Sequence, residues 1–226
     1  MTTYALAAQT IKGWRGTTGQ GNTPDLVTTI ANVNTLAATI ATDVTTLQNY
    51  GRIVFAKGIT AEDTSTGVTA GTNETAFTNL VQIPANTLAA NDIIRVRART
   101  FCVATNSTDT LALKLKFAAA AGLTSSTLVL SSTAATDVAN SDSQTLSAEL
   151  RVVAIGAAAT AKFNGSGMSF VDSAGTAIRG TAINDDTSVA TNAIIDCGVT
   201  YTWSVSNANN QVRIKHLFIE VIRPSA

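Results

Sequence analysis

The chain has 226 residues, of which 45% are hydrophobic and only 13% are charged, and its formal net charge at pH 7 is zero. A nucleic-acid-binding protein needs a basic excess to neutralise phosphates, so this balance excludes that class. Intrinsic disorder is excluded too, because apolar residues are plentiful and net charge is absent. The stretch from Met1 to Leu6 lacks the basic and apolar regions of a secretory signal. No apolar run reaches the about 20 residues that cross a bilayer, so we expect a protein made in the cytoplasm, with no membrane partner.

Residues 1–22 form a Gly-rich segment, and the glycines predict that it is flexible. Its centre carries Trp14 and Arg15, two residue types that are enriched in the anchors of protein interfaces. The segment is therefore either a docking peptide, with Trp14 and Arg15 as its contact residues, or an idle tail.

Residues 23–51 predict an N-terminal helix. Thr23 is suited to the N-cap, Pro24 to the first helical position, and Gly51 to the C-cap. Apolar residues recur in alternating steps of four and three, which is a heptad repeat. The residues of this predicted trimer seam are Leu26, Ile30, Val33, Ala37, Ile40, Val44 and Leu47.

The flanks of this seam carry threonine where a coiled coil usually carries Glu and Lys. Threonine is a poor helix former, so a helix this rich in threonine needs partners along its apolar face. The partner is either the body of its own domain, as for an ordinary amphipathic helix, or other copies of the chain. The strict seven-residue spacing favours a bundle of chains, and β-branched residues at both core positions favour three or more helices over two.

From Arg52 onward, apolar and polar residues alternate with period two, which predicts β-strands. Many short strands with turn-rich stretches between them are typical of an antiparallel β-sandwich or jelly roll, which we assign to residues 52–226. The predicted strands are Arg52–Lys57, Ala76–Ile83, Asp92–Ala104, Leu111–Phe117, Gln144–Ile155, Gly167–Val171, Thr176–Ile183, Ala193–Ser206 and Gln211–Arg223.

No pattern of residues predicts a catalytic site, a metal site or a cofactor site. His216 is the single histidine and lies in a strand pattern without a catalytic partner, so we expect it to be structural. Cys102 and Cys197 lie far apart, and without an export signal they are expected to be free thiols in strands. The glycines at 165 and 167 are expected to form a turn. Asp185 and Asp186 are expected in a solvated turn, although paired carboxylates could hold calcium.

Two further groups leave alternatives open. Arg95, Arg97 and Arg99 lie on one face of a predicted strand, and like charges at this spacing repel. They either pair with acidic residues across a neighbouring strand or subunit, which we favour, or they face an anionic ligand. Tyr201 and Trp203 share a strand face and either pack in the core, which we favour, or form a platform for a sugar.

Two parts of the sequence also resemble segments of a known group of proteins. Residues 72–75 and 82–88, running into 92–98, resemble a segment common in jelly-roll virion structural proteins of tailed bacteriophages, and the closing strand from Ile214 to Pro224 is similar to theirs. That group includes head or neck fibres, capsid decoration or cement proteins, and tail-fibre tips. The resemblance implies a structural role in a virion, and it implies no active-site residue.

The combined expectation is a non-enzymatic virion structural protein that is a homotrimer. It would be a capsid decoration (cement) or head-fibre protein, made in the host cytoplasm, which binds the major capsid protein or another virion protein through its N-terminal region. Two alternatives remain at this point. One is a tail or head fibre that binds a host-surface glycan, and the other is a free carbohydrate-binding jelly-roll module or an unrecognised hydrolase.

Overall fold

The computed structural model describes residues 31, 33–42, 51–66, 72–105, 108–119, 122–137, 139–172 and 177–224. The chain divides into two units, Met1–Leu47 and Gln48–Ala226, and each is described by itself. In the first unit the predicted helix is present at residues 31 and 33–42. Trp14, Arg15 and the remaining positions of the predicted helix up to Tyr50 lie outside the described residues.

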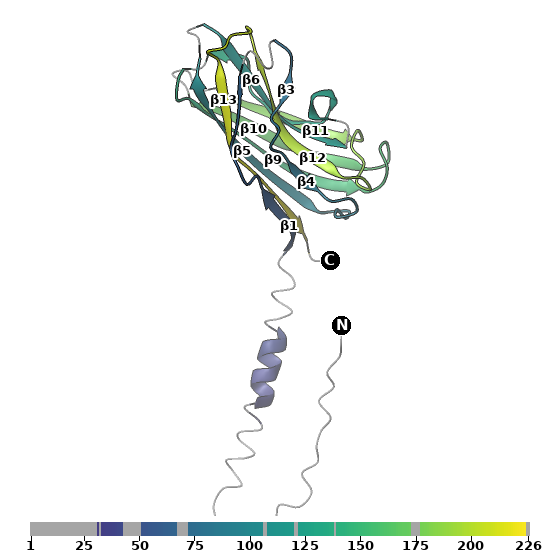
Figure 1. The fold of residues 1–226 in the computed structure, drawn as a ribbon. Helices are drawn as coiled ribbons and strands as arrows, with labels where there is room; N and C mark the ends of the chain where they lie inside the picture. The colour runs from purple at the N-terminus through teal and green to yellow at the C-terminus, as the bar shows by residue number, and fades with distance from the viewer. Residues whose placement is uncertain are drawn as a thin grey trace, which may run out of the picture. The chain divides into compact units, whose positions relative to one another are not determined.

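The second unit is a sandwich of two antiparallel sheets, which confirms the predicted fold class (Figure 1). The larger sheet has the order β1 (Arg52–Gly58), β13 (Gln211–Arg223), β5 (Ile93–Ala104), β9 (Ser143–Ala154), β10 (Lys162–Asp172) and β11 (Ala177–Asp186), with β2 (Asp63–Thr66) also on β13. The smaller sheet has the order β3 (Thr75–Ala76), β12 (Ile195–Trp203), β6 (Thr110–Ala119) and β7 (Val129–Ser132), with β4 (Val81–Ile83) on β12 and β8 (Thr136–Asp137) on β6. A short 3₁₀ helix, η1 (Leu123–Ser125), follows β6. The fold is consistent with a jelly roll.

The core lies between the sheets and is built from the alternating residues that defined the strands. Leu111, Leu113 and Leu115 of β6 are at most 1% exposed. Tyr201 and Trp203 of β12 are equally buried, at 1% and 0% exposure. The prediction that these two aromatic residues pack in the core is confirmed, so they form no platform for a sugar.

The expectation of a turn at residues 165–167 is wrong, because these residues lie inside β10. Close backbone contact explains the glycines: a Cβ on Gly165 would lie 2.1 Å from the carbonyl oxygen of Glu149, and one on Gly167 would lie 1.8 Å from that of Leu130. Leu130 belongs to β7 of the smaller sheet. The two sheets therefore approach each other at β7 and β10 more closely than any side chain would allow.

The predicted strand from Ala76 to Ile83 is broken into β3 and β4. The carboxylate of Asp63 accepts hydrogen bonds from the Thr78 backbone N–H (2.6 Å) and hydroxyl (2.7 Å), which removes Thr78 from the sheet. Strands β2, β7 and β8 were not predicted, since each has at most four residues and is rich in Ser and Thr.

The last strand is tied to the loop before β5 by an ion pair whose carboxylate is buried. Arg223 donates to both carboxylate oxygens of Asp92, at 2.9 and 2.8 Å, and to the carbonyl of Thr87 at 3.0 Å. Asp92 is fully buried and also accepts from the N–H of Ala89 at 2.8 Å. These bonds fix the end of β13 beside the start of β5, and β1 begins at the same end of the sandwich, where Arg52 is the register partner of Arg223.

Candidate functional site

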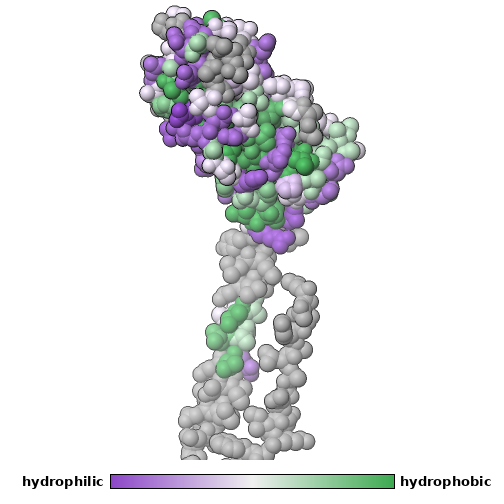
Figure 2. Space-filling model, in the orientation of Figure 1, coloured by the Kyte–Doolittle hydropathy of each residue, from purple (hydrophilic) through white to green (hydrophobic). Residues whose placement is uncertain are grey.

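The N-terminal helix exposes large apolar side chains. Val33 and Leu36 are each 59% exposed and Ile40 is 53% exposed, and the spacing of three and four residues places them on one side of the helix. Figure 2 shows green, hydrophobic surface along the described part of the helix. Val33, Ala37 and Ile40 are the described members of the predicted seam; Leu26, Ile30, Val44 and Leu47 lie outside the described residues.

The threonines of this helix turn their hydroxyl groups toward their own backbone. Thr35 donates to the carbonyl of Ala31 at 2.9 Å, Thr39 to that of Thr35 at 3.0 Å, and Thr42 to that of Ala38 at 3.0 Å. Such bonds to the residue four positions earlier satisfy the hydroxyl without water but slightly destabilise a helix. The helix therefore has a less polar surface than its composition suggests, and little stability of its own.

Apolar side chains are also exposed at the end of the sandwich where β1 begins. Ile53 in β1 is 58% exposed, Ile155 after β9 is 51% exposed, and Ile194 before β12 is 46% exposed. Figure 2 shows green residues gathered toward this end of the sandwich. A concentration of large apolar side chains on a protein surface is typical of a contact region.

The outer face of the larger sheet contains a groove of about 710 Å³. Its walls come from four adjacent strands, β13, β5, β9 and β10. One row of register partners runs across these strands from Phe218 through Arg97 and Ser147 to Met168. The row beside it runs from Glu220 through Arg95 and Glu149 to Ser166. The side chains of Ser147 and Ser166 are small, and they leave a hollow between their larger neighbours.

The three predicted arginines of β5 have three different environments. Arg95 forms an ion pair with Glu149 of β9 at 2.9 Å, which confirms for this residue the expected pairing across a neighbouring strand. Arg99 donates to the hydroxyl of Ser143 at 3.1 Å instead of to a carboxylate. Arg97 is exposed and has neither an ion pair nor a hydrogen bond from its side chain to any residue that the structure describes.

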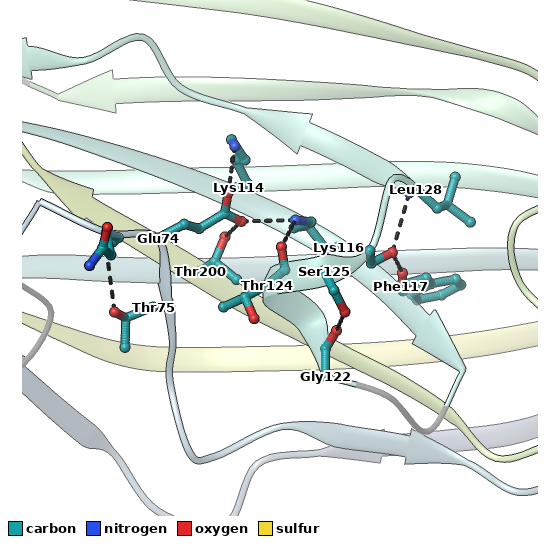
Figure 3. A network of polar contacts seen from close by, with 12 residues as sticks. Glu74, Thr75, Lys114, Lys116, Phe117, Gly122, Thr124, Ser125, Leu128 and Thr200 are labelled. Atoms are coloured by element: carbon teal, nitrogen blue, oxygen red, sulfur yellow. Dashed lines mark hydrogen bonds and ion pairs between the residues drawn. The ribbon is translucent and has the colours of Figure 1, made fainter.

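On the smaller sheet, a polar network surrounds the carboxylate of Glu74 (Figure 3). The ammonium groups of Lys114 and Lys116 lie 2.7 and 2.8 Å from its two oxygens, and the hydroxyl of Thr200 donates to it at 2.7 Å. The Lys116 side chain is only 3% exposed and also donates to the carbonyl of Thr124 at 3.3 Å. This network is a fully partnered structural site that joins the segment before β3 to β6 and β12.

The network sets the charge state of Glu74. Burial by itself raises the pKa of this carboxyl group, but the hydrogen bonds from Lys114, Lys116 and Thr200 outweigh it and lower the pKa to about 2. Glu74 is therefore ionised throughout the physiological pH range. The sequence pattern missed this site, because its members lie in three separate segments of the chain.

Of the remaining predicted residues, His216 lines the groove of the larger sheet, and the two cysteines lie elsewhere. Cys102 and Cys197 are free, as predicted, and both are buried. Burial raises the pKa of the Cys102 thiol to about 11 and that of Cys197 well above its usual value. His216 lies in β13 with an exposed ring that stacks on Phe218 at a centroid distance of 6.1 Å.

Asp185 and Asp186 end β11, where the carboxylate of Asp186 accepts from the N–H and hydroxyl of Ser188 at 2.8 and 2.6 Å. Among the described residues, no three His, Cys, Asp or Glu side chains are grouped so that they could hold a metal ion.

None of the described helices combines the length and the hydropathy needed to cross a membrane. No protein-family model and no curated protein matches the chain. Solved structures that are similar to it include several lectins. A seed lectin of Lotus tetragonolobus is 7% identical, with a TM-score of 0.40, over 75% of this chain and 99% of the lectin.

Two other solved structures have a similar level of likeness. The CBM2 module of evolved Dit from Lactobacillus casei BL23 phage J-1 is 10% identical, with a TM-score of 0.32, over 77% of this chain and 97% of the module. The PL-14 alginate lyase from Aplysia kurodai is 10% identical, with a TM-score of 0.34, over 66% of this chain and 75% of the lyase. At these TM-scores the likeness is too distant to transfer a ligand, an activity or a site to this chain.

Proposed function

We propose that this protein is a non-enzymatic virion structural protein of a tailed bacteriophage, which assembles as a homotrimer and decorates the head as a cement or fibre protein. The observation that carries the self-assembly is the exposed apolar face of the Thr-rich helix. Three large apolar side chains more than half exposed on one short helix would be unfavourable in an isolated chain. Burying them against the same face of other copies removes that penalty.

The residue types on this face favour three helices over two. Val33 and Ile40 occupy one seam position and are β-branched, and Leu36, beside Ala37, widens the apolar stripe. β-branched residues at both core positions are typical of bundles with more than two helices. The exposed Ile53, Ile155 and Ile194 give the sandwich an apolar end that trimerisation can also cover.

The test is the mass of the full-length protein, measured by light scattering coupled to gel filtration. We expect a trimer for the wild type and a monomer for the double variant Val33→Lys/Ile40→Lys, because six ammonium groups would meet in the bundle core. The matched control is Thr35→Lys/Thr42→Lys, which places the same residue type at the same spacing on the opposite side of the helix. It should remain trimeric.

Two results would contradict the proposal. One is a monomeric wild-type protein at micromolar concentration. The other is an equal loss of trimer in both variants, which would show that the added charge, and not the apolar seam, controls the assembly.

A further inference from the structure

We propose that the groove on the outer face of the larger sheet is a binding site for a neutral oligosaccharide. This site does not depend on the proposed trimer, because the walls of the groove come from β13, β5, β9 and β10 of a single chain. Its volume of about 710 Å³ lies within the range of about 300–1,000 Å³ that is typical of small-molecule sites.

The row from Phe218 to Met168 crosses four strands, so its ends are about 14 Å apart at the usual strand spacing. This length accommodates several sugar rings. The row continues to Gly180 of β11, where an added Cβ would meet nothing within 4 Å, so the groove is open at that side. An open-ended groove suits an internal stretch of a chain better than a single small molecule.

The chemistry of the walls matches the two kinds of surface on a sugar. Met168 is 59% exposed and Phe218 is half-buried, and both offer apolar surface to the C–H faces of a ring. Between them, Arg97 has five N–H donors with no partner among the described residues, in a planar arrangement that can bond two neighbouring hydroxyl groups. In the neighbouring row of the groove, the carboxylates of Glu149 and Glu220 can accept hydrogen bonds from the hydroxyl groups of a sugar.

The charges of the groove favour a neutral ligand. Arg95 and Arg97 contribute two positive charges, and Glu149 and Glu220 contribute two negative charges, so the charged groups of the lining balance. Arg95 lies opposite both glutamates in the register and is already paired with Glu149. An acidic sugar would gain Arg97 as a partner, but it would also approach two carboxylates, which repel it.

A second copy of the chain is a less suitable occupant than a saccharide. The centres of protein–protein interfaces are depleted of charged residues, whereas this groove has an exposed Arg–Glu pair in the middle, with side chains 51% and 57% exposed. A hydroxyl-rich ligand can replace the water around these groups with its own hydrogen bonds, which an apolar protein surface cannot do.

The experiment screens the full-length protein against immobilised cellohexaose, maltohexaose, mannohexaose and chitohexaose, with hexagalacturonate as an acidic probe. The dissociation constant for the probe that binds best is then measured by calorimetry. We expect binding to a neutral probe, and the variant Arg97→Ala should weaken it at least tenfold, because hydrogen bonds to a charged group are lost. Met168→Ser should also weaken it, through the loss of apolar contact.

The matched control is Arg151→Ala, which removes an exposed arginine from the same face of β9 but outside the groove. It should bind as the wild type does. The proposal is overturned if no neutral probe binds, if hexagalacturonate binds more tightly than every neutral probe, or if Arg97→Ala and Arg151→Ala have equal effects. It is also overturned if Arg97→Glu changes the oligomeric mass, since the groove would then be an interface between copies.

Discussion

Lys116 is a cation that the sandwich buries almost completely, and Glu74 is the residue that makes this possible. A buried ammonium group without a counter-charge is strongly destabilising, whereas a paired one with its hydrogen bonds filled is tolerated. Glu74 contacts Lys114 and Lys116 from β6 and Thr200 from β12, so a single carboxylate joins two strands and the segment before β3.

We expect Glu74→Gln to lower the free energy of unfolding at pH 7 by about 3 kcal/mol, since Lys116 loses its counter-charge. The pKa of Glu74 is about 2 in the folded protein and near 4.5 when unperturbed, so its contribution is present above pH 4.5 and is lost as the pH falls toward 2. Urea unfolding of both proteins at pH 7 and pH 3 should therefore show a smaller difference at pH 3.

The control for this prediction is Glu62→Gln. Glu62 also contacts two cations, Arg213 and Lys215, each at 3.0 Å, but its side chain is 44% exposed. Exposed pairs contribute about 1 kcal/mol or less. Equal losses in the two variants would mean that burial does not determine the strength of the Glu74 network.

Gly167 is the second residue whose role depends on packing. We expect Gly167→Ala to destabilise the protein by about 3 kcal/mol or more, because the new methyl group would overlap the Leu130 carbonyl and force β7 away from β10. Gly180→Ala in the next strand is the matched control. The added methyl group would have no atom within 4 Å, so this variant should change the free energy of unfolding by less than about 0.5 kcal/mol. Thermal unfolding of the two variants measures the contrast, and a neutral Gly167→Ala would show that the sheets can separate there.

At the scale of elements, the alternation of apolar and polar residues was a reliable guide wherever a strand had one face in the core. Strands β5, β6, β9 and β13 follow the predicted ranges to within two residues at either end. The pattern was less informative for β10, because backbone contact with β9 at Gly165 and with β7 at Gly167, and not turn formation, explains its glycines. The helix is present where it is described, and its trimer seam stays a prediction.

At the scale of the whole molecule, the proposed attachment to the particle rests on Trp14 and Arg15. We expect the double variant Trp14→Ala/Arg15→Ala to bind particles that lack the protein at least tenfold more weakly, because Trp and Arg are the residue types that most often dominate interface energies. Co-sedimentation with such particles measures the binding.

The oligomeric mass and the melting temperature of this variant serve as controls and should match those of the wild type. If the variant binds undiminished, the sandwich makes the contact and residues 1–22 are a passive tail.

The sequence by itself determined the two-sheet class and the burial of Tyr201 and Trp203, because both depend on the local alternation of apolar and polar residues. Only the tertiary structure decided the Glu74 network, the place of Gly167 and the groove from Phe218 to Met168. Each of these brings together residues from strands far apart in the chain. Period-two alternation states which face of a strand is buried, but pairing and register between strands determine which exposed side chains become neighbours.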